Sequence, residues 1–66
     1  HGNRTLREGL DAAMQVGAIR PLPLDALTGL LAAAFDRAAL SIEAGGDSKA
    51  HGQALAALIE GLAARA

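Results

Sequence analysis

The sequence predicts an all-α fold of three helices. The composition is 52% hydrophobic and is dominated by alanine and leucine, and Phe35 is the only aromatic residue. Alanine and leucine favour helices, whereas the β-branched and aromatic residues typical of strands are sparse. Glycine and proline interrupt the apolar pattern at two places, between Gly17 and Pro23 and at Gly45-Gly46. These interruptions divide the chain into three helical segments.

The first helix is expected to run from about residue 5 to residue 16. Thr5 and Glu8 have the spacing of a capping box, in which each side chain bonds to the backbone amide of the other residue. Gly17 is expected to end the helix, because glycine enters the left-handed conformation at little cost. One face of this helix is apolar and consists of Leu6, Leu10, Ala13 and Met14.

The second helix is expected to run from about residue 23 to residue 44, a length of roughly 33 Å at 1.5 Å per residue. Its broad apolar face consists of Leu24, Leu27, Leu31, Phe35, Ala38 and Ile42. An acidic stripe of Asp25, Asp36 and Glu43 borders a second apolar strip, which consists of Ala26, Leu30, Ala33 and Leu40. A surface helix needs one apolar stripe, so two stripes predict burial on two sides.

The third helix is expected to run from about residue 47 to residue 64, with Asp47 or Ser48 as its N-cap. Its main apolar face consists of Leu55, Leu58, Ile59 and Leu62. Gly52 and Gly61 lie inside this segment, where each costs about 1 kcal/mol relative to alanine. Small residues at such positions allow neighbouring helices to approach closely, so this helix is also expected to be buried on more than one side.

The length of the chain limits how much core it can build. A fold of 66 residues buries only about 60% of the surface that its unfolded chain exposes, and small domains usually gain stability from disulfides, metals or a partner. The chain has no cysteine and only two histidines, which leaves association with another chain. It begins at His1 without an initiator methionine, so we expect a piece of a longer polypeptide, although a processed chain would look the same.

Charge and hydropathy exclude several classes of function. The net charge is −1 and the cations are scattered, so this segment lacks the basic cluster that nucleic-acid binding needs. No apolar run reaches the length of a membrane span and no signal peptide is visible, which predicts a soluble, cytoplasmic chain. Asp25 and Asp36 are three turns apart, and His51 has no second ligand at a suitable spacing. We therefore expect no catalytic residues, no metal site and no cofactor.

Breaks and small residues follow one another along the chain in a characteristic order. Gly17-Ala18-Ile19-Arg20-Pro21 follows the first helix, and Leu30-Leu31-Ala32-Ala33-Ala34-Phe35 leads to Ala38-Ala39-Leu40 in the second. Gly45-Gly46-Asp47 then precedes a final helix rich in alanine and leucine. Over residues 6–64 this pattern resembles the C-terminal end of TetR-family transcriptional regulators.

The resemblance implies an architecture and a function. In that family an N-terminal helix-turn-helix domain binds operator DNA, and a C-terminal helical domain binds a small-molecule effector. The last two helices pair with a second copy in a four-helix dimer interface. Residues 1–66 would then be a fragment of the regulatory and dimerisation domain of a repressor. The chain would form a homodimer, would not be an enzyme, and would contact DNA only through the N-terminal domain that it lacks.

The resemblance and the apolar strips together assign candidate site residues. Those expected in the dimer interface are Leu30, Ala33, Arg37, Leu40, Leu55, Ile59 and Leu62. Those expected on the side of the effector pocket are Leu10, Met14, Leu31 and Phe35. Plain core packing is an alternative role for Met14 and Phe35, and a merely exposed charge is an alternative for Arg37. The alternative functions are a helical scaffold or adaptor module unrelated to DNA, and a small subunit of an enzyme.

Overall fold

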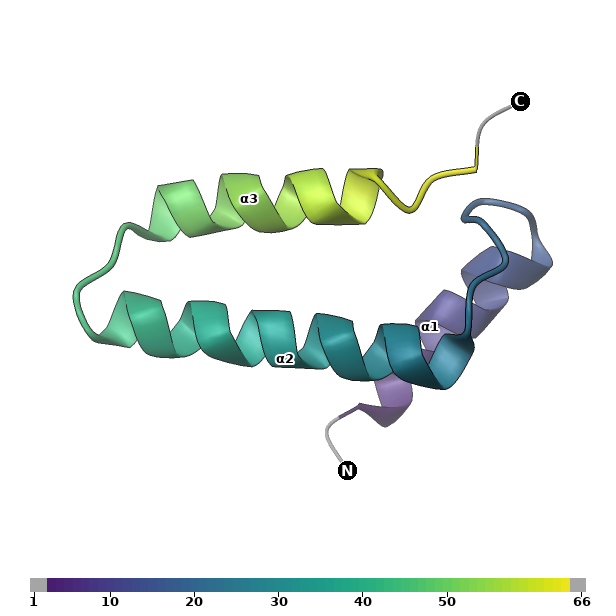
Figure 1. Cartoon of the computed structure of the whole chain (residues 1–66), viewed down its shortest axis with the longest axis horizontal. Coiled ribbons are helices and arrows are strands. Elements are labelled where there is room, and N and C mark those ends of the chain that lie inside the picture. The colour runs from purple at the N-terminus through teal and green to yellow at the C-terminus, as the bar shows by residue number, and fades with distance from the viewer. Residues whose placement is uncertain (1–2, 65–66) are drawn as a thin grey trace.

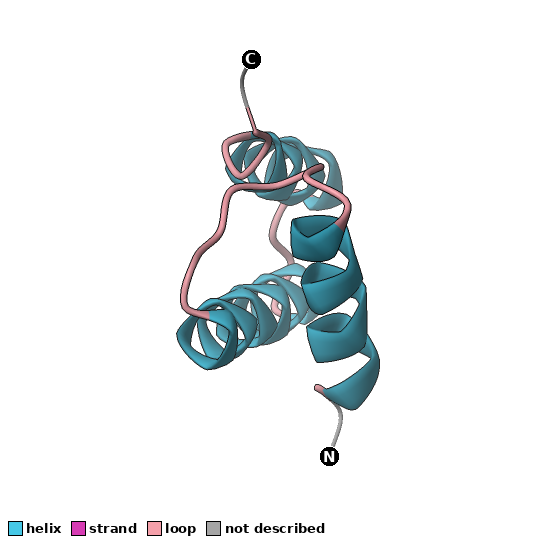
Figure 2. Ribbon diagram, turned by 90° about the vertical axis from the view of Figure 1, so that its right-hand side faces the viewer, coloured by secondary structure: helices cyan, strands magenta, loops and turns pink. Residues whose placement is uncertain are grey.

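Three helices make up the part of the chain that this computed structural model describes, residues 3–64. α1 spans Arg4–Gln15, α2 spans Leu24–Glu43 and α3 spans Ser48–Glu60. α2 and α3 run antiparallel beside one another, and α1 crosses α2 near the N-terminal end of α2 (Figure 1). Viewed from the end, α1 lies on one side of the pair, and no helix of the described residues lies on the opposite side (Figure 2). The prediction of an all-α fold with three helices is confirmed.

The start of α1 differs from the prediction. The helix begins at Arg4 with Asn3 as its N-cap, and no side chain caps it. Thr5 therefore lies inside the first turn, and the expected capping box between Thr5 and Glu8 is absent. Glu8 instead pairs with Arg4 at 3.7 Å, the arrangement expected of opposite charges one helical turn apart.

The end of α1 follows the expected glycine stop. Gly17 has a φ of 77°, in the left-handed region that favours glycine. Its amide donates to the carbonyl of Met14 at 3.1 Å, and the amide of Ala18 donates to the carbonyl of Ala13 at 2.9 Å. These bonds satisfy carbonyls that the end of a helix leaves open, so the link that follows is held against the last turn of α1.

The turn between α2 and α3 depends on Gly46 and Asp47. The amide of Gly46 donates to the carbonyl oxygen of Ser41 at 2.8 Å, and a Cβ at position 46 would lie only 2.7 Å from that oxygen. The Asp47 carboxylate accepts from the amide of Lys49 at 2.9 Å and from that of Ala50 at 3.2 Å. Asp47 is therefore the N-cap of α3, one of the two residues that the sequence offered for this role.

α3 is shorter than the sequence suggested. It ends at Glu60 with Gly61 as its C-cap, where helix was expected to about residue 64. Gly61 and Leu62 form a turn, and the amides of Leu62 and Ala63 donate to carbonyls at the end of α3. Ala63 then forms an antiparallel bridge with Ile19 in the link between α1 and α2. Hydrogen bonds to a distant segment replace further helical turns here, which local helix propensity cannot reveal.

The core is small and centres on α2. Thr28, Leu31 and Ala38 are buried, and among the described residues no side chain is completely enclosed. The Thr28 hydroxyl donates to the carbonyl oxygen of Leu24 at 2.8 Å, which satisfies the buried polar group within its own helix. The core therefore occupies one side of α2 only.

Candidate functional site

The second apolar strip of α2 lies in the open. Leu30 is 72% exposed and Leu40 is 58% exposed, and Ala33 and Arg37 between them are exposed as well. Helical spacing places these four residues roughly opposite the buried Thr28, Leu31 and Ala38. The part of the chain that the structure describes leaves this strip uncovered.

The predicted residues of α3 divide between two environments. Leu55 and Leu62 are half-buried, whereas Ile59 is 45% exposed. Leu58, which the sequence-based set omitted, is 58% exposed. Leu58 and Ile59 fall on opposite sides of the line through Leu55 and Leu62 at 100° per residue.

Handedness decides which of these two residues shares a side with the strip on α2. When two antiparallel helices lie side by side, residues displaced in the same sense of rotation from the line of contact lie on the same face of the pair. Viewed from the N-terminus of each helix, Arg37 lies anticlockwise of the buried residues of α2, and Leu58 lies anticlockwise of the half-buried residues of α3. Leu58 therefore belongs with the exposed strip, and Ile59 lies on the side of α1. We call Leu30, Ala33, Arg37, Leu40 and Leu58 the open face.

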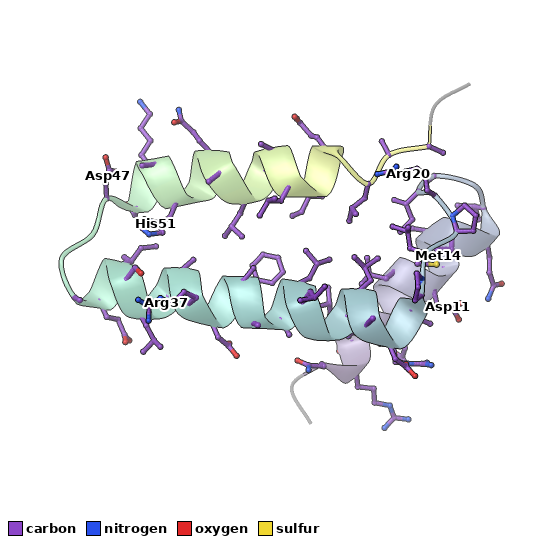
Figure 3. The ribbon with its side chains drawn as sticks, viewed as in Figure 1. Asp11, Met14, Arg20, Arg37, Asp47 and His51 are labelled. Carbon is purple, nitrogen blue, oxygen red and sulfur yellow. The ribbon has the colours of Figure 1, made fainter. Side chains whose placement is uncertain are left out.

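Arg37 is the charged residue of the open face. Its guanidinium makes no hydrogen bond or ion pair within residues 3–64, unlike those of Arg7 and Arg20. Figure 3 shows its position along α2, facing the viewer while α1 lies behind. An arginine stem can cover apolar surface while its head remains solvated or meets an acid, so Arg37 is compatible with an interface.

The four residues assigned to the effector side lie on α1 and on the opposite side of α2. Leu31 is 7% exposed, Leu10 and Met14 are half-buried, and Phe35 is 38% exposed. Leu31 therefore belongs to the core, Leu10 and Met14 are partly covered, and Phe35 lies at the edge of the covered side of α2. An open depression in the surface lies elsewhere and is lined by Arg20, Pro21, Gly61, Ala63 and Ala64.

Two close polar contacts hold Arg7 against Asp25 and the His51 ring against the backbone of Asp47. Arg7 of α1 donates through Nε to Oδ1 of Asp25 in α2 at 2.8 Å, and this hydrogen bond and charge raise the pKa of Arg7. The Nδ1 atom of His51 lies 2.8 Å from the carbonyl oxygen of Asp47, so this ring nitrogen can donate to it. His51 therefore folds back over the first turn of α3 (Figure 3).

Metal-binding clusters and membrane-spanning helices are both absent from residues 3–64. No three acidic, histidine or cysteine side chains of this segment come together as a group that could hold a metal ion. None of its helices combines the length and the hydropathy that crossing a bilayer requires.

The surface area of the chain is large for its mass. A folded monomer of 6.6 kDa is expected to expose about 3,900 Å², whereas this chain exposes 4850 Å². Its radius of gyration is 12.9 Å, against about 11 Å expected for a compact chain of this length. The difference in area, about 1,000 Å², is similar to the roughly 800 Å² that each partner buries in a standard protein interface. The chain is therefore less compact than an average monomer of its mass.

These features define the class of protein: residues 3–64 form a small helical domain built around one long helix, and they cover that helix on one side only. Residues 1–65 match the family described as "Tetracyclin repressor-like, C-terminal domain". The chain therefore belongs to this family, and the resemblance found in the sequence is confirmed. A search of curated proteins and a search of solved structures return no match.

Proposed function

We propose that this chain is the dimerisation and effector-sensing part of a TetR-type DNA-binding transcriptional regulator that acts as a repressor. The observation that carries the proposal is the open face, an apolar side of α2 that stays exposed in a chain belonging to a family of repressor-like C-terminal domains. Isolated exposed leucines are common on protein surfaces. Leu30, Leu40 and Leu58 instead share one side of an antiparallel helix pair, which is the geometry of a helix–helix interface.

The proposed occupant of the open face is a second copy of this chain. Most soluble oligomers are symmetric, and a two-fold axis lets one patch serve both partners. The small side chain of Ala33 and the open space around Gly29 would allow the two α2 helices to approach closely. The stem of Arg37 would cover apolar surface of the second copy, and its head would meet an acidic side chain there. The surplus of exposed area supports an interface of ordinary size.

The effector is assigned to the side of α2 that carries α1. Leu10, Met14, Leu31 and Phe35 supply apolar side chains on that side, and ligand pockets are lined mainly by such residues. An effector that binds one arrangement of the dimer better than another shifts the population toward it. Because a dimer interface fixes the separation of two DNA-reading heads, such a shift changes how well the dimer fits two half-sites. DNA contacts would come from a helix-turn-helix domain outside this segment.

The test is the size of the intact protein in solution, measured by light scattering after size-exclusion chromatography. We expect Ala33→Arg to convert a dimer into a folded monomer, because the added charge would be buried between two copies. Ala12→Arg is the matched control, since it makes the same change at an exposed position of α1. A dimer that survives Ala33→Arg would remove the open face from the interface.

A second pair of variants separates the interface from the fold. Leu58→Asp should give monomers with unchanged helix content, because Leu58 is exposed within the single chain. Leu55→Asp, one turn away and half-buried, should instead lower the helix content, because its side chain packs between helices. If Leu55→Asp alone gave folded monomers, the interface would follow the residues predicted from the sequence and would exclude Leu58.

DNA binding by the intact protein decides between the repressor and the scaffold or adaptor module. A dimer that binds DNA and is released by a small molecule supports the proposal. A dimer that binds no DNA supports the scaffold.

A further inference from the structure

The C-terminal end of α3 is tied to the link that follows α1. The backbone amide of Arg20 donates to the carbonyl oxygen of Leu62 at 3.0 Å, and the amide of Ala64 donates to the carbonyl oxygen of Ala18 at 3.1 Å. Together these bonds form a short antiparallel ladder between segments more than forty residues apart in the sequence. α2 takes no part in it.

The side chain of Arg20 strengthens the same connection. Its Nη2 atom donates to the carbonyl oxygen of Gly61 at 2.6 Å, so backbone and side chain of one residue satisfy two successive carbonyls at the end of α3. Hydrogen bonds from an ionised donor are stronger than neutral ones. A cation at a helix C-terminus also interacts favourably with the helix dipole. Figure 3 shows the side chain of Arg20, which belongs to the link, next to the end of α3.

The other end of this connection is held by α1. The amides of Gly17 and Ala18 donate to carbonyls in the last turn of α1, so the link cannot move freely relative to that helix. Within residues 3–64 the helices α1 and α3 are not themselves packed on one another. The hydrogen bonds of residues 18–20 with residues 61–64, which we call the Arg20 clamp, are therefore a direct path between α1 and α3.

We infer that the Arg20 clamp is a coupling device that transmits a displacement or loosening of α1 to the C-terminal turn of α3. Without the clamp, α1 and α3 would communicate only through their separate contacts with α2. With it, the last turn of α1, residues 18–20 and the last turn of α3 form one continuous hydrogen-bonded segment, and coupling between sites is carried by such contiguous networks. Because α3 contributes Leu58 to the open face, the clamp would also carry events at α1 to the dimer interface, a consequence that rests on the proposed function.

Hydrogen exchange of the intact protein, followed by mass spectrometry, tests the coupling. Leu10→Ala removes packing between α1 and α2 and loosens α1 without touching the clamp. We expect it to raise exchange over residues 58–64 by about 2- to 30-fold, the range that typical coupling energies give, and by more than over residues 32–42 of α2. In an Arg20→Ala background, which removes the side-chain bond to Gly61 and keeps the two backbone bonds, the same change should raise exchange over residues 58–64 by a clearly smaller factor.

A thermodynamic cycle of these variants distinguishes coupling from simple capping. If Arg20 were only a cap, Leu10→Ala would change exchange over residues 58–64 by the same factor with and without Arg20, and the inference would be overturned. It would also be overturned if Leu10→Ala left that segment unchanged when Arg20 is present. Where Leu10→Ala unfolds the protein, Arg7→Ala replaces it, because that residue joins α1 to α2 from an exposed position.

Arg4→Ala is the matched control for the loss of a guanidinium. Arg4 lies in the first turn of α1, its side chain is almost fully exposed, and it has no part in the clamp. It should leave both the exchange of residues 58–64 and their response to Leu10→Ala unchanged. The readout needs neither DNA nor an effector, and the oligomeric state is measured separately by light scattering, so failure of the clamp and failure of the proposed function can be told apart.

Discussion

Leu30 and Leu31 are neighbours in the sequence, but Leu30 is 72% exposed and Leu31 is 7% exposed. One step along a helix turns the side chain by about 100°, which carries it from the open face into the core. The two residues have the same side chain and the same local helix. They therefore offer a direct comparison between a contact made within one chain and a contact that the proposed dimer would make.

Leu31→Ala should destabilise the fold itself. Removing a buried leucine costs about 2–5 kcal/mol through lost burial and the cavity left behind, a large part of the stability of a small domain. The free energy of unfolding is measured by urea denaturation followed by circular dichroism. Leu30→Ala should lower the unfolding midpoint only at protein concentrations where dimers form. Equal, concentration-independent losses for both variants would contradict this distinction.

The sequence predicted most of what is local and little of what is distant. The helix breaks at Gly17 and Gly45 follow from the residue type, because glycine adopts positive φ at little cost. The cap at Asp47 follows in the same way, because a short acidic side chain can accept from the first amides of a helix. The absence of a cap at Thr5 shows the limit of such patterns, because the helix begins one residue earlier, at Arg4, and places Thr5 inside its first turn. The end of α3 was missed because its hydrogen bonds come from Arg20, far away along the chain.

The candidate site shows the same division. Helical period alone identified the exposed strip of α2, because the acidic stripe separates it from the core face. On α3 the apolar residues are continuous around much of the helix, so the period could not choose between Leu58 and Ile59. That choice required the direction of α2 relative to α3 (Figure 1). Gly52 was expected to allow close helix packing, yet a methyl group there would meet no atom within 4 Å in this chain.

Asp47→Ala should loosen the start of α3. The carboxylate accepts two backbone amides that would otherwise lack partners, and loss of such an N-cap costs about 1 kcal/mol. Thermal denaturation of the intact protein measures the effect. Asp47→Asn is the matched control, because its side-chain oxygen can accept the same bonds, and it should retain most of the stability. If the asparagine and alanine variants were equally unstable, charge rather than capping would account for the role of Asp47.

Gly46→Ala and Gly9→Ala should act in opposite directions. A methyl group at position 46 would lie 2.7 Å from the carbonyl oxygen of Ser41 and 3.2 Å from Cε1 of His51, so the turn would have to shift. Gly9 lies inside α1 with no atom within 4 Å of an added Cβ, and alanine there should raise helix stability by about 0.5–1 kcal/mol. Melting temperatures of the two variants compare them. A stabilising Gly46→Ala would mean that the turn accommodates a side chain at no cost.

The ion pair of Arg7 and Asp25 should stabilise the junction of α1 and α2 weakly and in a salt-dependent way. Both side chains are largely exposed, so solvent and ions screen the pair. A double-mutant cycle of Arg7→Ala and Asp25→Ala should give a coupling free energy smaller than the effect of Asp47→Ala, and this coupling should shrink further in high salt.

The pH dependence of the same ion pair follows from the pKa of Arg7. The hydrogen bond and charge of Asp25 raise this pKa, so the stabilisation linked to the protonation of Arg7 is fully present below the pKa that Arg7 has in the unfolded chain. It is lost only as the pH rises through that raised pKa, in the strongly alkaline range. A coupling that disappeared between neutral and moderately alkaline pH would show that deprotonation of another group controls this junction.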